Sequence, residues 1–554
     1  MKNQGKEKIK EKKATLKERQ KVRSCKKLEK IAIFLRVVSM AVLLVIGAAV
    51  VTRYVGLNNN QKVVFSHQNG FYDEDFEVEL SAETKERTWG ISVRYNLSGD
   101  DLSRTYTEYS KPIRLTVPEV GYKVYTITAT LCYFNEKCVP PYTRTYVLGK
   151  KLREDVNLDI ININSSFDNL YSYENGIMVK GKTYDDNLRR NHDAPLIEGN
   201  YNQRSEDWIR DSYVTMFSSD GKILFDKNLG IQISGNTSAL ADVKSMKIMG
   251  NKKYGYSKIP FDFGDGVELY NSIKLSNGGQ DHWWGHVRSS VASRLAEQAG
   301  FDGYSPTKRV TVFLNGRFYG VYDAQLNYSD SNIAKIFRLP SNNFIEKYKS
   351  EEMTTFEDAG IRSLFETDLN DASNRVKLEE KVDMDNYLLY YALQILWQNI
   401  DWPVNNFEIW RYTGGYDSGN FYTDGRWRFL IYDVDCAYYC NEYMNHYAYD
   451  FFAELISEDP TRENTSFKNV MEPDYYRNRF IKILKELIDG PFATKNVLDI
   501  INSETDKIDK QLQLWYKEDE YNNWMEEVNH LKRLVLGVNS MLRADILKYY
   551  KINI

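Results

Sequence analysis

Three carboxylates and an amide occupy two short stretches that directly follow apolar segments. Asp401 and Asn406 belong to DWPVNN, and Asp433 and Asp435 end the segment WRFLIYDVD. If the two stretches meet, one site holds all four side chains. Carboxylates that lie so close repel one another unless one is protonated or a divalent cation neutralises them. Because the candidate ligands are all oxygens, we expect the cation to be Mg²⁺ or Mn²⁺.

The spacing of these residues matches one known use of such a site, phosphoryl transfer. In protein kinases a catalytic Asp is followed five residues later by a metal-binding Asn, and a second metal-binding Asp comes later in the chain. We therefore expect Asp401 to accept the proton of the attacking hydroxyl. Asn406 and Asp433 would hold Mg²⁺ against the phosphates of ATP, and Asp435 would be a second ligand or an orienting group.

A kinase also needs a cradle for the phosphates and a Lys. The stretch GIQISGNTS provides a turn with Gly235, and the following strand carries Lys244 and Lys247, either of which could pair with the α or β phosphate. Structural roles for Gly235 and Lys244 are the alternative, since a glycine turn is usually only a turn. Asp401 could likewise be a helix-end cap in an exposed loop.

The elements that must position these residues mix strands and helices. Strand, turn and strand are expected in NLGIQISGNTS with VKSMKIMG, and RVTVFLNGRFYGVYDA contains an Asn-Gly turn, which is typical of a β-hairpin. NYLLYYALQILWQN predicts a buried helix before Asp401, and NFEIWRY predicts a strand after Asn406. From Tyr475 onward the apolar spacing is helical.

The amino terminus predicts a membrane anchor. Residues 1–30 are rich in Lys and Arg, and the apolar run 31–52 is broken only by Arg36. About 20 such residues span a bilayer as a helix, and flanking basic residues stay on the cytoplasmic side. The remaining chain would then lie across the membrane, although a cleaved signal peptide is the alternative. We expect no nucleic-acid partner for the basic tail.

Residues 63–150 alternate in short β runs, with turn residues between them, which predicts an antiparallel sandwich. Outside the cytoplasm a disulfide between Cys132 and Cys138 is expected, whereas Cys436 and Cys440 are buried thiols or a local disulfide. FSHQNGFYDEDFEVEL, SKPIRL and YTITATLCY resemble the β-sandwich modules appended to chitobiases and other bacterial surface enzymes. The resemblance implies a spacer or a glycan-binding module.

The larger part of the chain is similar to the spore-coat CotH-type atypical kinases. The similarity runs from about Gly176 through the segments GKTYDDN, GIQISGNTSALADVKSMKI, LSNGGQD, VFLNGRFYGVY, NIDWPVNNFEIWR and WRFLIYDVDCAYY. It implies a kinase-like fold that uses ATP and Mg²⁺ to phosphorylate Ser or Thr of a surface or spore-coat protein. It also implies that Asp401 is the catalytic Asp and that Asp433 is the metal-binding Asp.

Three positions depart from that family pattern. Ser276 stands where members carry Arg, Ser289 stands where they carry Asp, and Leu326 stands where they carry an acidic residue. If the missing acid pairs with the nucleotide Lys, Glu346 and Glu351 are candidate replacements. A weak kinase, a nucleotide-binding pseudokinase or a surface binding protein is therefore the alternative function.

Other chemistries have weaker support. The stretch DVD also fits a metal-dependent glycosyltransferase, and paired carboxylates fit a glycosidase, but a glycosidase leaves Asn405 and Asn406 unexplained. His282 and His286, with Asp281, have a spacing that fits zinc, although a packed histidine pair is the simpler interpretation. No G-x-S-x-G stretch indicates a nucleophilic hydrolase.

The 554 residues, 42% of them hydrophobic, are enough for two or more domains. We expect an α+β fold: a kinase-like mixed domain with a helical carboxyl-terminal part, preceded by a transmembrane helix and a sandwich. The expected regions are a basic cytoplasmic tail (1–30), a signal anchor (31–52), a linker (53–62), a sandwich (63–150), a kinase core (159–455) and a helical part (456–554).

Overall fold

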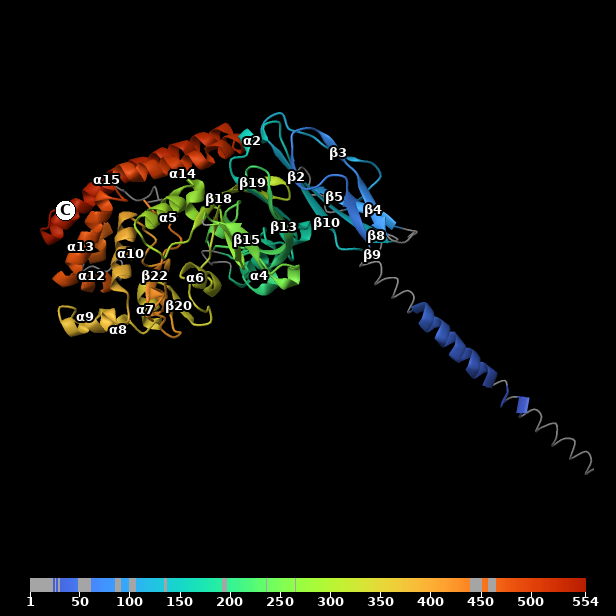
Figure 1. Ribbon diagram of the computed structural model, residues 1–554, viewed down its shortest axis with the longest axis horizontal. Helices are drawn as coiled ribbons and strands as arrows, with labels where there is room; N and C mark the ends of the chain where they lie inside the picture. Colours follow the sequence, from blue (N-terminus) through green and yellow to red (C-terminus); the bar gives the residue numbers. More distant parts are fainter. Residues whose placement is uncertain are drawn as a thin grey trace, which may run out of the picture.

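The computed structural model shows a mixed α+β protein whose carboxyl-terminal part is helical (Figure 1). It describes residues 23–24, 26–27, 30–47, 61–84, 91–98, 106–133, 137–191, 197–235, 237–264, 266–438, 451–456 and 465–554. Figure 1 shows three folded regions in a row: a β region, a barrel and a helical region. The expected fold class is therefore confirmed.

One helix near the amino terminus is long and apolar enough to cross a membrane. It covers Lys30–Gly47, 18 residues with a mean hydropathy of 2.2. A signal sequence has the same length and composition. The helix therefore fits the expected anchor without deciding between an anchor and a signal sequence.

The first β region is built on one large sheet. Its strands run in the order β2, β10, β8, β5, β6, with β9 paired to β8; they are Gly70–Tyr72, Tyr142–Leu148, Lys123–Tyr133, Ile91–Ser98, Thr107–Glu108 and Lys137–Cys138. Two small sheets pair β1 with β4 and β3 with β7: Gln61–Phe65, Leu80–Thr84, Phe76–Val78 and Ile113–Leu115. Their apolar side chains form one core with the inner face of the large sheet. We call this region the sandwich.

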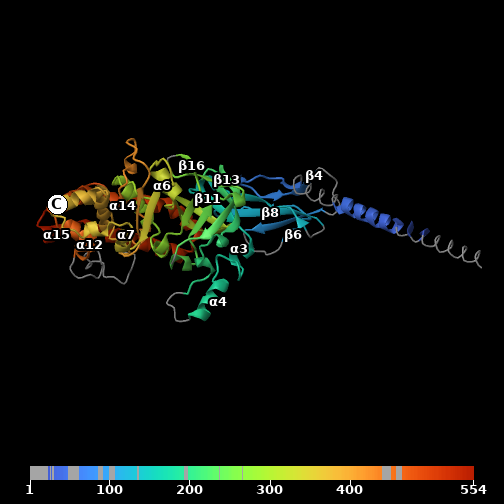
Figure 2. The same ribbon diagram turned by 90° about the horizontal axis from the view of Figure 1, so that it is seen from below.

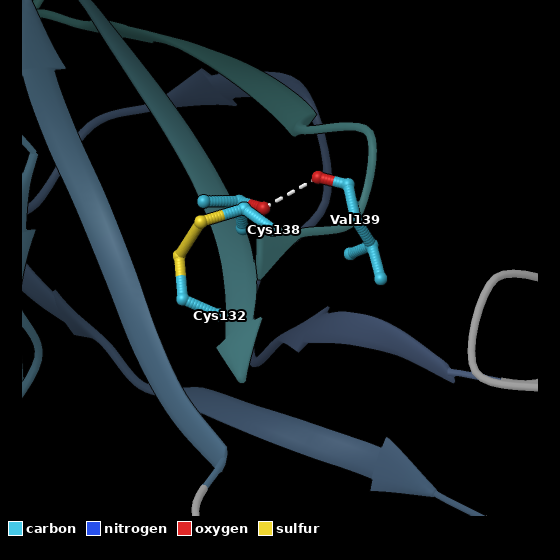
Figure 3. The surroundings of a disulfide bond; sticks show 4 residues. Cys132, Cys138 and Val139 are labelled. Carbon is cyan, nitrogen blue, oxygen red and sulfur yellow. Dashed lines mark hydrogen bonds between the residues drawn. A yellow bond between two sulfur atoms is a disulfide. The ribbon is translucent and has the colours of Figure 1, made fainter. Parts of the chain in front are cut away.

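A disulfide joins Cys132 to Cys138 across the β8–β9 hairpin (Figure 3). Thr130 Oγ1 donates to the carbonyl oxygen of Val139, 2.6 Å away, and holds the chain just beyond the bridge. The expected disulfide is thus confirmed. Cys440 lies outside the described residues, so its pairing with Cys436 stays a prediction.

Seven strands then close into a barrel in the order β11, β12, β13, β14, β17, β19, β18. They cover Asp159–Asn164, Arg210–Phe217, Ile223–Ile233, Met246–Met249, Ser272–Ser276, Arg317–Gln325 and Thr307–Leu314. The β18–β19 hairpin turns at Asn315 and Gly316, whose φ angles of 51° and 77° are the positive values that such a turn requires. The expected hairpin is therefore present, and β13 pairs antiparallel with β14, as the predicted strand, turn and strand require.

Short elements decorate the barrel. The hairpin of β15 and β16 covers Ile259–Asp262 and Val267–Tyr270, and α2 and α3 cover Leu152–Asp155 and Phe167–Tyr171. Figure 2 shows α4, Gly181–Arg190, projecting from the barrel. Helix α5, Arg288–Gln298, follows the loop after β17 and buries its apolar face in the helical region.

The helical region is built around α10, Met384–Leu396, which is buried on almost every side as its sequence predicts. Beside it a three-stranded sheet pairs β20, β21 and β22, which cover Ile345–Ser350, Phe407–Tyr412 and Arg428–Leu430. The other helices, α6–α9 and α11–α15, cover Asp330–Ile336, Glu352–Asp358, Arg362–Phe365, Ala372–Glu379, Phe451–Ile456, Thr465–Met471, Asp474–Asp489, Thr494–Trp515 and Glu518–Tyr550.

The sandwich packs directly onto the barrel through a layer of polar side chains that we call the seam. The seam consists of Thr126, Thr128, Thr145, Asn162, Asn164 and Thr215. Asn162 Nδ2 donates to Thr126 Oγ1 at 2.8 Å, and Asn164 Nδ2 donates to Thr128 Oγ1 at 2.9 Å. The hydroxyls of Thr145 and Thr215 are 2.9 Å apart. Because these groups satisfy one another, burying them carries no unpaired-polar penalty.

Helix α14 touches both neighbouring regions. Gln511 accepts a hydrogen bond from the Tyr122 hydroxyl of the sandwich at 2.7 Å, and its Nε2 donates to the carbonyl oxygen of Asp155 at 2.8 Å. At the end of the same helix, Trp515 stacks on Phe318 of the barrel with ring centres 4.8 Å apart. The three regions therefore meet at one helix (Figure 1).

Candidate functional site

The main cavity is a cleft of about 870 Å³ between the barrel and the three-stranded sheet. The barrel supplies a serine- and glycine-rich wall, and the helical region supplies most of the acidic residues. Five of the candidate site residues line the cleft: Gly235, Asp401, Asn406, Asp433 and Asp435. The structure thus brings together the two stretches that the sequence separates.

Asp401 is oriented by the two amides that follow it. Asn405 Nδ2 donates to Asp401 Oδ1 at 3.0 Å, and Asn406 Nδ2 donates to Asp401 Oδ2 at 2.6 Å. Both carboxylate oxygens therefore accept a hydrogen bond on one side, and lone pairs remain for a ligand. This geometry accounts for the amides of DWPVNN as a clamp on the carboxylate.

The backbone around the clamp adopts left-handed conformations. Asn406 and Asp433 have φ angles of 58° and 55°, a region that Asn and Asp tolerate better than most residues. Asn406 Nδ2 also lies 3.4 Å from the carbonyl oxygen of Asp433, which ties the two loops together. The preceding segment is anchored by Trp402, which is fully buried among the aromatic rings of α10. The loops are therefore fixed by the core behind them.

Asp435 has a different environment from its neighbours. It is buried, and its Oδ2 accepts a hydrogen bond from the backbone N–H of Gln280 at 2.5 Å. Burial, together with the nearby Asp433, raises the pKa of Asp435 to about 8. Gly279, with φ 62°, lies against this carboxylate, so a side chain at position 279 would collide with it. The N-G-G turn is thus shaped around Asp435.

A buried ion pair supports this turn from behind. Arg288 bonds to Asp281 Oδ1 through its guanidinium, and its backbone N–H donates to Asp281 Oδ2 at 2.8 Å. Arg288 Nε also donates to the carbonyl oxygen of Ala437 at 3.0 Å, just past Asp435. One arginine therefore connects the N-G-G-x-D turn, the start of α5 and the loop that carries Asp435.

The structure does not bring Lys244 to the cleft. Its ammonium group donates to the carbonyl oxygens of Ala239 and Ala241, at 2.7 and 2.8 Å, and lies over the Tyr201 ring. Burial lowers the pKa of Lys244 to about 8. Lys247 is on β14 beside Lys274 in register but is not among the residues that line the cleft. Neither of the two lysines expected to hold the nucleotide is therefore among the residues that line the cleft.

Two other lysines do line the cleft, Lys274 on β17 and Lys349 on β20. Lys274 makes no ion pair with any residue in the described part of the chain. Lys349 is opposite Glu408 in the β20–β21 register, with Nζ 4.0 Å from Glu408 Oε2. Burial lowers the pKa of Lys349 and raises the pKa of Glu408. The opposite charge of each partner acts against the pKa shift that burial causes in the other. This pair faces the same space as Asp433.

The donor set fits a small hard cation only in part. In the described ranges no three His, Cys, Asp or Glu side chains are close enough to hold a metal by themselves. Asp401, Asp433 and Asp435 therefore share the cleft without forming a closed cage. Mg²⁺ commonly binds through one or two carboxylates and the phosphates of a nucleotide. Asp433, Asp435 and Asn406 line the cleft and are the side chains that would hold such an ion.

The three positions that depart from the family pattern all line the cleft. Ser276, Ser289 and Leu326 leave its barrel wall uncharged at the points where charges were expected. Of the proposed replacement acids, Glu351 lines the cleft, whereas Glu346 is paired with Arg411 at 2.6 Å. Glu351 can thus reach a ligand in the cleft and Glu346 is already engaged.

The two histidines pack as a pair. His286 is buried, and its Nε2 is 2.9 Å from the carbonyl oxygen of Val321. Its ring centre is 5.8 Å from that of His282. Burial lowers the pKa of both imidazoles, so they stay neutral at pH 7. This geometry fits the simpler interpretation of the histidine spacing.

Sequence reasoning missed Lys274, Lys349 and Glu408. The sequence predicted the strand NFEIWRY that carries Glu408, but it predicted no strand at Lys349. The sequence could not predict the register of the two strands, which places Lys349 opposite Glu408. Asn405 was noticed in the sequence but received no role, and the structure gives it one.

Comparison with protein families gives one match. Residues 338–536 match the family model described as CotH kinase protein. The matched range contains Asp401, Asn406, Asp433 and Asp435, together with most of the helical region. A search of curated proteins finds no match to this chain.

Proposed function

We propose, from the premise that this chain carries a CotH kinase family domain over residues 338–536, that it transfers the γ-phosphate of ATP to Ser or Thr hydroxyls of a protein. The observation that carries the proposal is the arrangement of Asp401 and Asp433 in one cleft, with Asn406 bonded to both loops.

In this proposal Asp401 accepts the proton of the attacking hydroxyl. Its clamp holds the carboxylate in one orientation, and geometry of this kind is what a general base requires. Asn406, Asp433 and Asp435 would hold the metal ion. A bound Mg²⁺ or Mn²⁺ supplies charge neutralisation of the phosphates.

The phosphate end of ATP would face Lys274 and Lys349. Protein kinases use a lysine paired with a glutamate to hold the phosphates. Lys349 with Glu408 provides such a pair across β20 and β21, and Lys274 adds a second positive charge from the barrel. Gly235 and Ser238, in the turn after β13, line the same space and would approach the phosphates through backbone and hydroxyl groups. We therefore assign the phosphate contacts to Lys274 and Lys349 in place of Lys244 and Lys247.

The proposed location is the cell membrane, with the basic tail in the cytoplasm and the folded regions outside. The apolar helix Lys30–Gly47 and the Cys132–Cys138 disulfide support it, since disulfides persist outside the cytoplasm. The substrate would be a surface or spore-coat protein, as the family resemblance implies. Protease digestion of intact cells tests the topology, because only an outward-facing chain is cut.

The direct test of the function uses the full chain in detergent with ATP labelled on its γ-phosphate. The chain is incubated with Mg²⁺ or Mn²⁺, and label is followed in the chain itself and in casein. We expect the wild-type chain to transfer the label, and we expect this transfer to be lost in Asp401→Asn and in Asp433→Asn. Asp358→Asn, at an exposed position on α7 outside the cleft, is the matched control. Transfer that survives both cleft substitutions would exclude this site.

A second candidate function is nucleotide binding with little or no transfer. It is favoured by the uncharged side chains at Ser276, Ser289 and Leu326, which all line the cleft. The two candidates differ in one measurement. Saturable binding of ATP that depends on Lys349 and Asp433, without label transfer, would identify a pseudokinase.

A further inference from the structure

A second cavity of about 620 Å³ lies where the sandwich meets the barrel. The sandwich provides one wall from β5, β8 and the start of β10, and the barrel provides the other from β11, β12 and β13. We call it the junction groove. Its volume is within the range of small-molecule sites. None of its lining residues also lines the cleft.

The lining of the junction groove mixes polar and apolar surface and is almost uncharged. Amide and hydroxyl side chains dominate, and Asp211 and Lys253 are the only charged residues among those that line it. A phosphate-rich ligand would need a basic surface, and a lipid would need an apolar one. The groove has no basic surface, and amides and hydroxyls interrupt its apolar surface. The composition instead suits a ligand that is neutral and rich in hydroxyl groups.

Aromatic rings complete the groove. Tyr106 of the sandwich and Tyr213, Tyr254 and Phe167 of the barrel line it. Aromatic side chains offer an apolar face and, in tyrosine, a polar edge. Sugar rings present both kinds of surface, with C–H groups on their faces and hydroxyls on their edges. Rings next to amides therefore match the chemistry of a saccharide.

Several polar groups in the groove have no partner of their own. The Asn228 amide, the Tyr106 hydroxyl and the Tyr254 hydroxyl make no hydrogen bond with any residue that the structure describes. Asn228 and Tyr106 are exposed, so solvent or a ligand must satisfy them. An amide offers donors and an acceptor, and a sugar hydroxyl is both donor and acceptor. Such groups can therefore form pairs of hydrogen bonds with the hydroxyls of a sugar.

The two walls of the groove are held in fixed positions. Thr128 and Asn164 belong to the seam and also line the groove, and their side chains are bonded at 2.9 Å. Ser98 of the sandwich is 3.4 Å from Asn164 Oδ1 beside them. Because these bonds cross between the two regions, the groove exists before any ligand arrives. A preformed site avoids the entropy cost of ordering its walls on binding.

We propose that the junction groove is a binding site for a neutral oligosaccharide, formed jointly by the sandwich and the barrel. The resemblance of the sandwich implies a spacer or a glycan-binding module, whereas the observed cavity is lined by both regions. No group in the groove is arranged as a nucleophile with a base, so the site binds without cleaving. The site does not depend on phosphoryl transfer in the cleft.

The test is calorimetric titration of the full chain in a detergent without a sugar headgroup. The probes are cellohexaose, maltohexaose and chitohexaose, added separately. We expect saturable binding of at least one of them, with an affinity that falls about tenfold or more in Asn228→Leu and in Tyr106→Ala. Both positions are exposed, so the variants should fold, and their thermal unfolding is measured alongside.

Matched controls separate the groove from the rest of the surface. Asn523→Leu and Tyr416→Ala make the same changes at exposed positions outside the groove, and Asp401→Asn alters the cleft. All three should bind the sugar as wild type does. The proposal is overturned if none of the three probes binds, or if binding is unchanged in both groove variants. A peptide that binds in place of the sugars would also overturn it.

Discussion

The cleft and the seam are both polar regions between larger bodies of structure, yet they treat polar groups in opposite ways. In the seam the side chains are neutral, buried and bonded to one another, as with Asn162 and Thr126. In the cleft, carboxylates crowd together, and burial beside Asp433 raises the pKa of Asp435 to about 8. Groups that satisfy one another hold a structure together, whereas groups left unsatisfied are available to a ligand.

The seam and the cleft also differ in how their polar groups affect the free energy of folding. The polar groups of the seam gain partners that offset the loss of water. Those of the cleft, Asp433 and Asp435 in particular, raise the free energy of the folded chain until a cation or a proton neutralises them. Substitutions should therefore lower activity but not stability in the cleft, and stability but not chemistry in the seam.

The largest effect is expected from Asp401→Asn. Removing the general base should lower the rate of phosphoryl transfer by about 10²- to 10⁴-fold, because that is the typical contribution of a positioned base. The initial rate of label transfer at saturating ATP measures it, and thermal unfolding should change little. A variant as active as Asp358→Asn would remove Asp401 from the mechanism.

Asn162→Ala in the seam is expected to have a smaller effect, and to change the stability of the protein. Asn162 donates to Thr126 and Thr145 and accepts from the Gly316 N–H, so its loss leaves buried groups without partners. The free energy of unfolding should fall by about 1–3 kcal/mol, measured by urea denaturation. Asn523→Leu on the surface of α15 serves as the control. An unchanged stability would show that the seam is not holding the two regions together.

The pH dependence of stability should distinguish the two regions next. Asp435 has a pKa of about 8 in the folded chain and an ordinary value of about 3.9 when unfolded, so folding favours its protonated form. Its contribution to stability is complete below about pH 4 and is lost as the pH rises to about 8. Measured with a chelator present, Asp435→Asn should lack this loss. An identical pH profile for wild type and variant would contradict the assignment.

The smallest effect is expected from Asn405→Ala. This residue supplies one exposed hydrogen bond to Asp401, so transfer should slow about two- to tenfold, corresponding to roughly 0.5–1.5 kcal/mol. The rate at saturating ATP is the measurement, with the apparent affinity for ATP unchanged. A loss as large as that of Asp401→Asn would mean that the asparagine itself contacts the substrate.

How far the sequence could predict this molecule depended on the distance between partners along the chain. Asp401 and Asn406 share one loop, and Asp433 follows the next hairpin, so local patterns were enough to bring them together. Lys274 and Lys349 come from strands far apart in sequence, and their shared position in the cleft depends on a strand register that no local pattern encodes. The sequence also could not show that the ammonium group of Lys244 turns back to two nearby carbonyls.

The seam shows the same limit. Strand β8 alternates Thr126, Ile127, Thr128 and Ala129, which predicts an apolar core face and a threonine face toward water. The core face is as expected, but the threonines are buried against the barrel. Alternation in the sequence identifies the two faces of a strand. It does not show whether the polar face packs against another part of the protein.

The contacts of α14 bear on how this protein can be divided for study. Tyr122, Phe318 and Trp515 come from three regions and cover one another at the end of that helix. A truncation that removes the sandwich would expose Phe318 and Trp515 to water and would remove the Tyr122 hydroxyl that donates to Gln511. The smallest piece worth expressing therefore begins at β1 and keeps the final helices, and shorter fragments should aggregate.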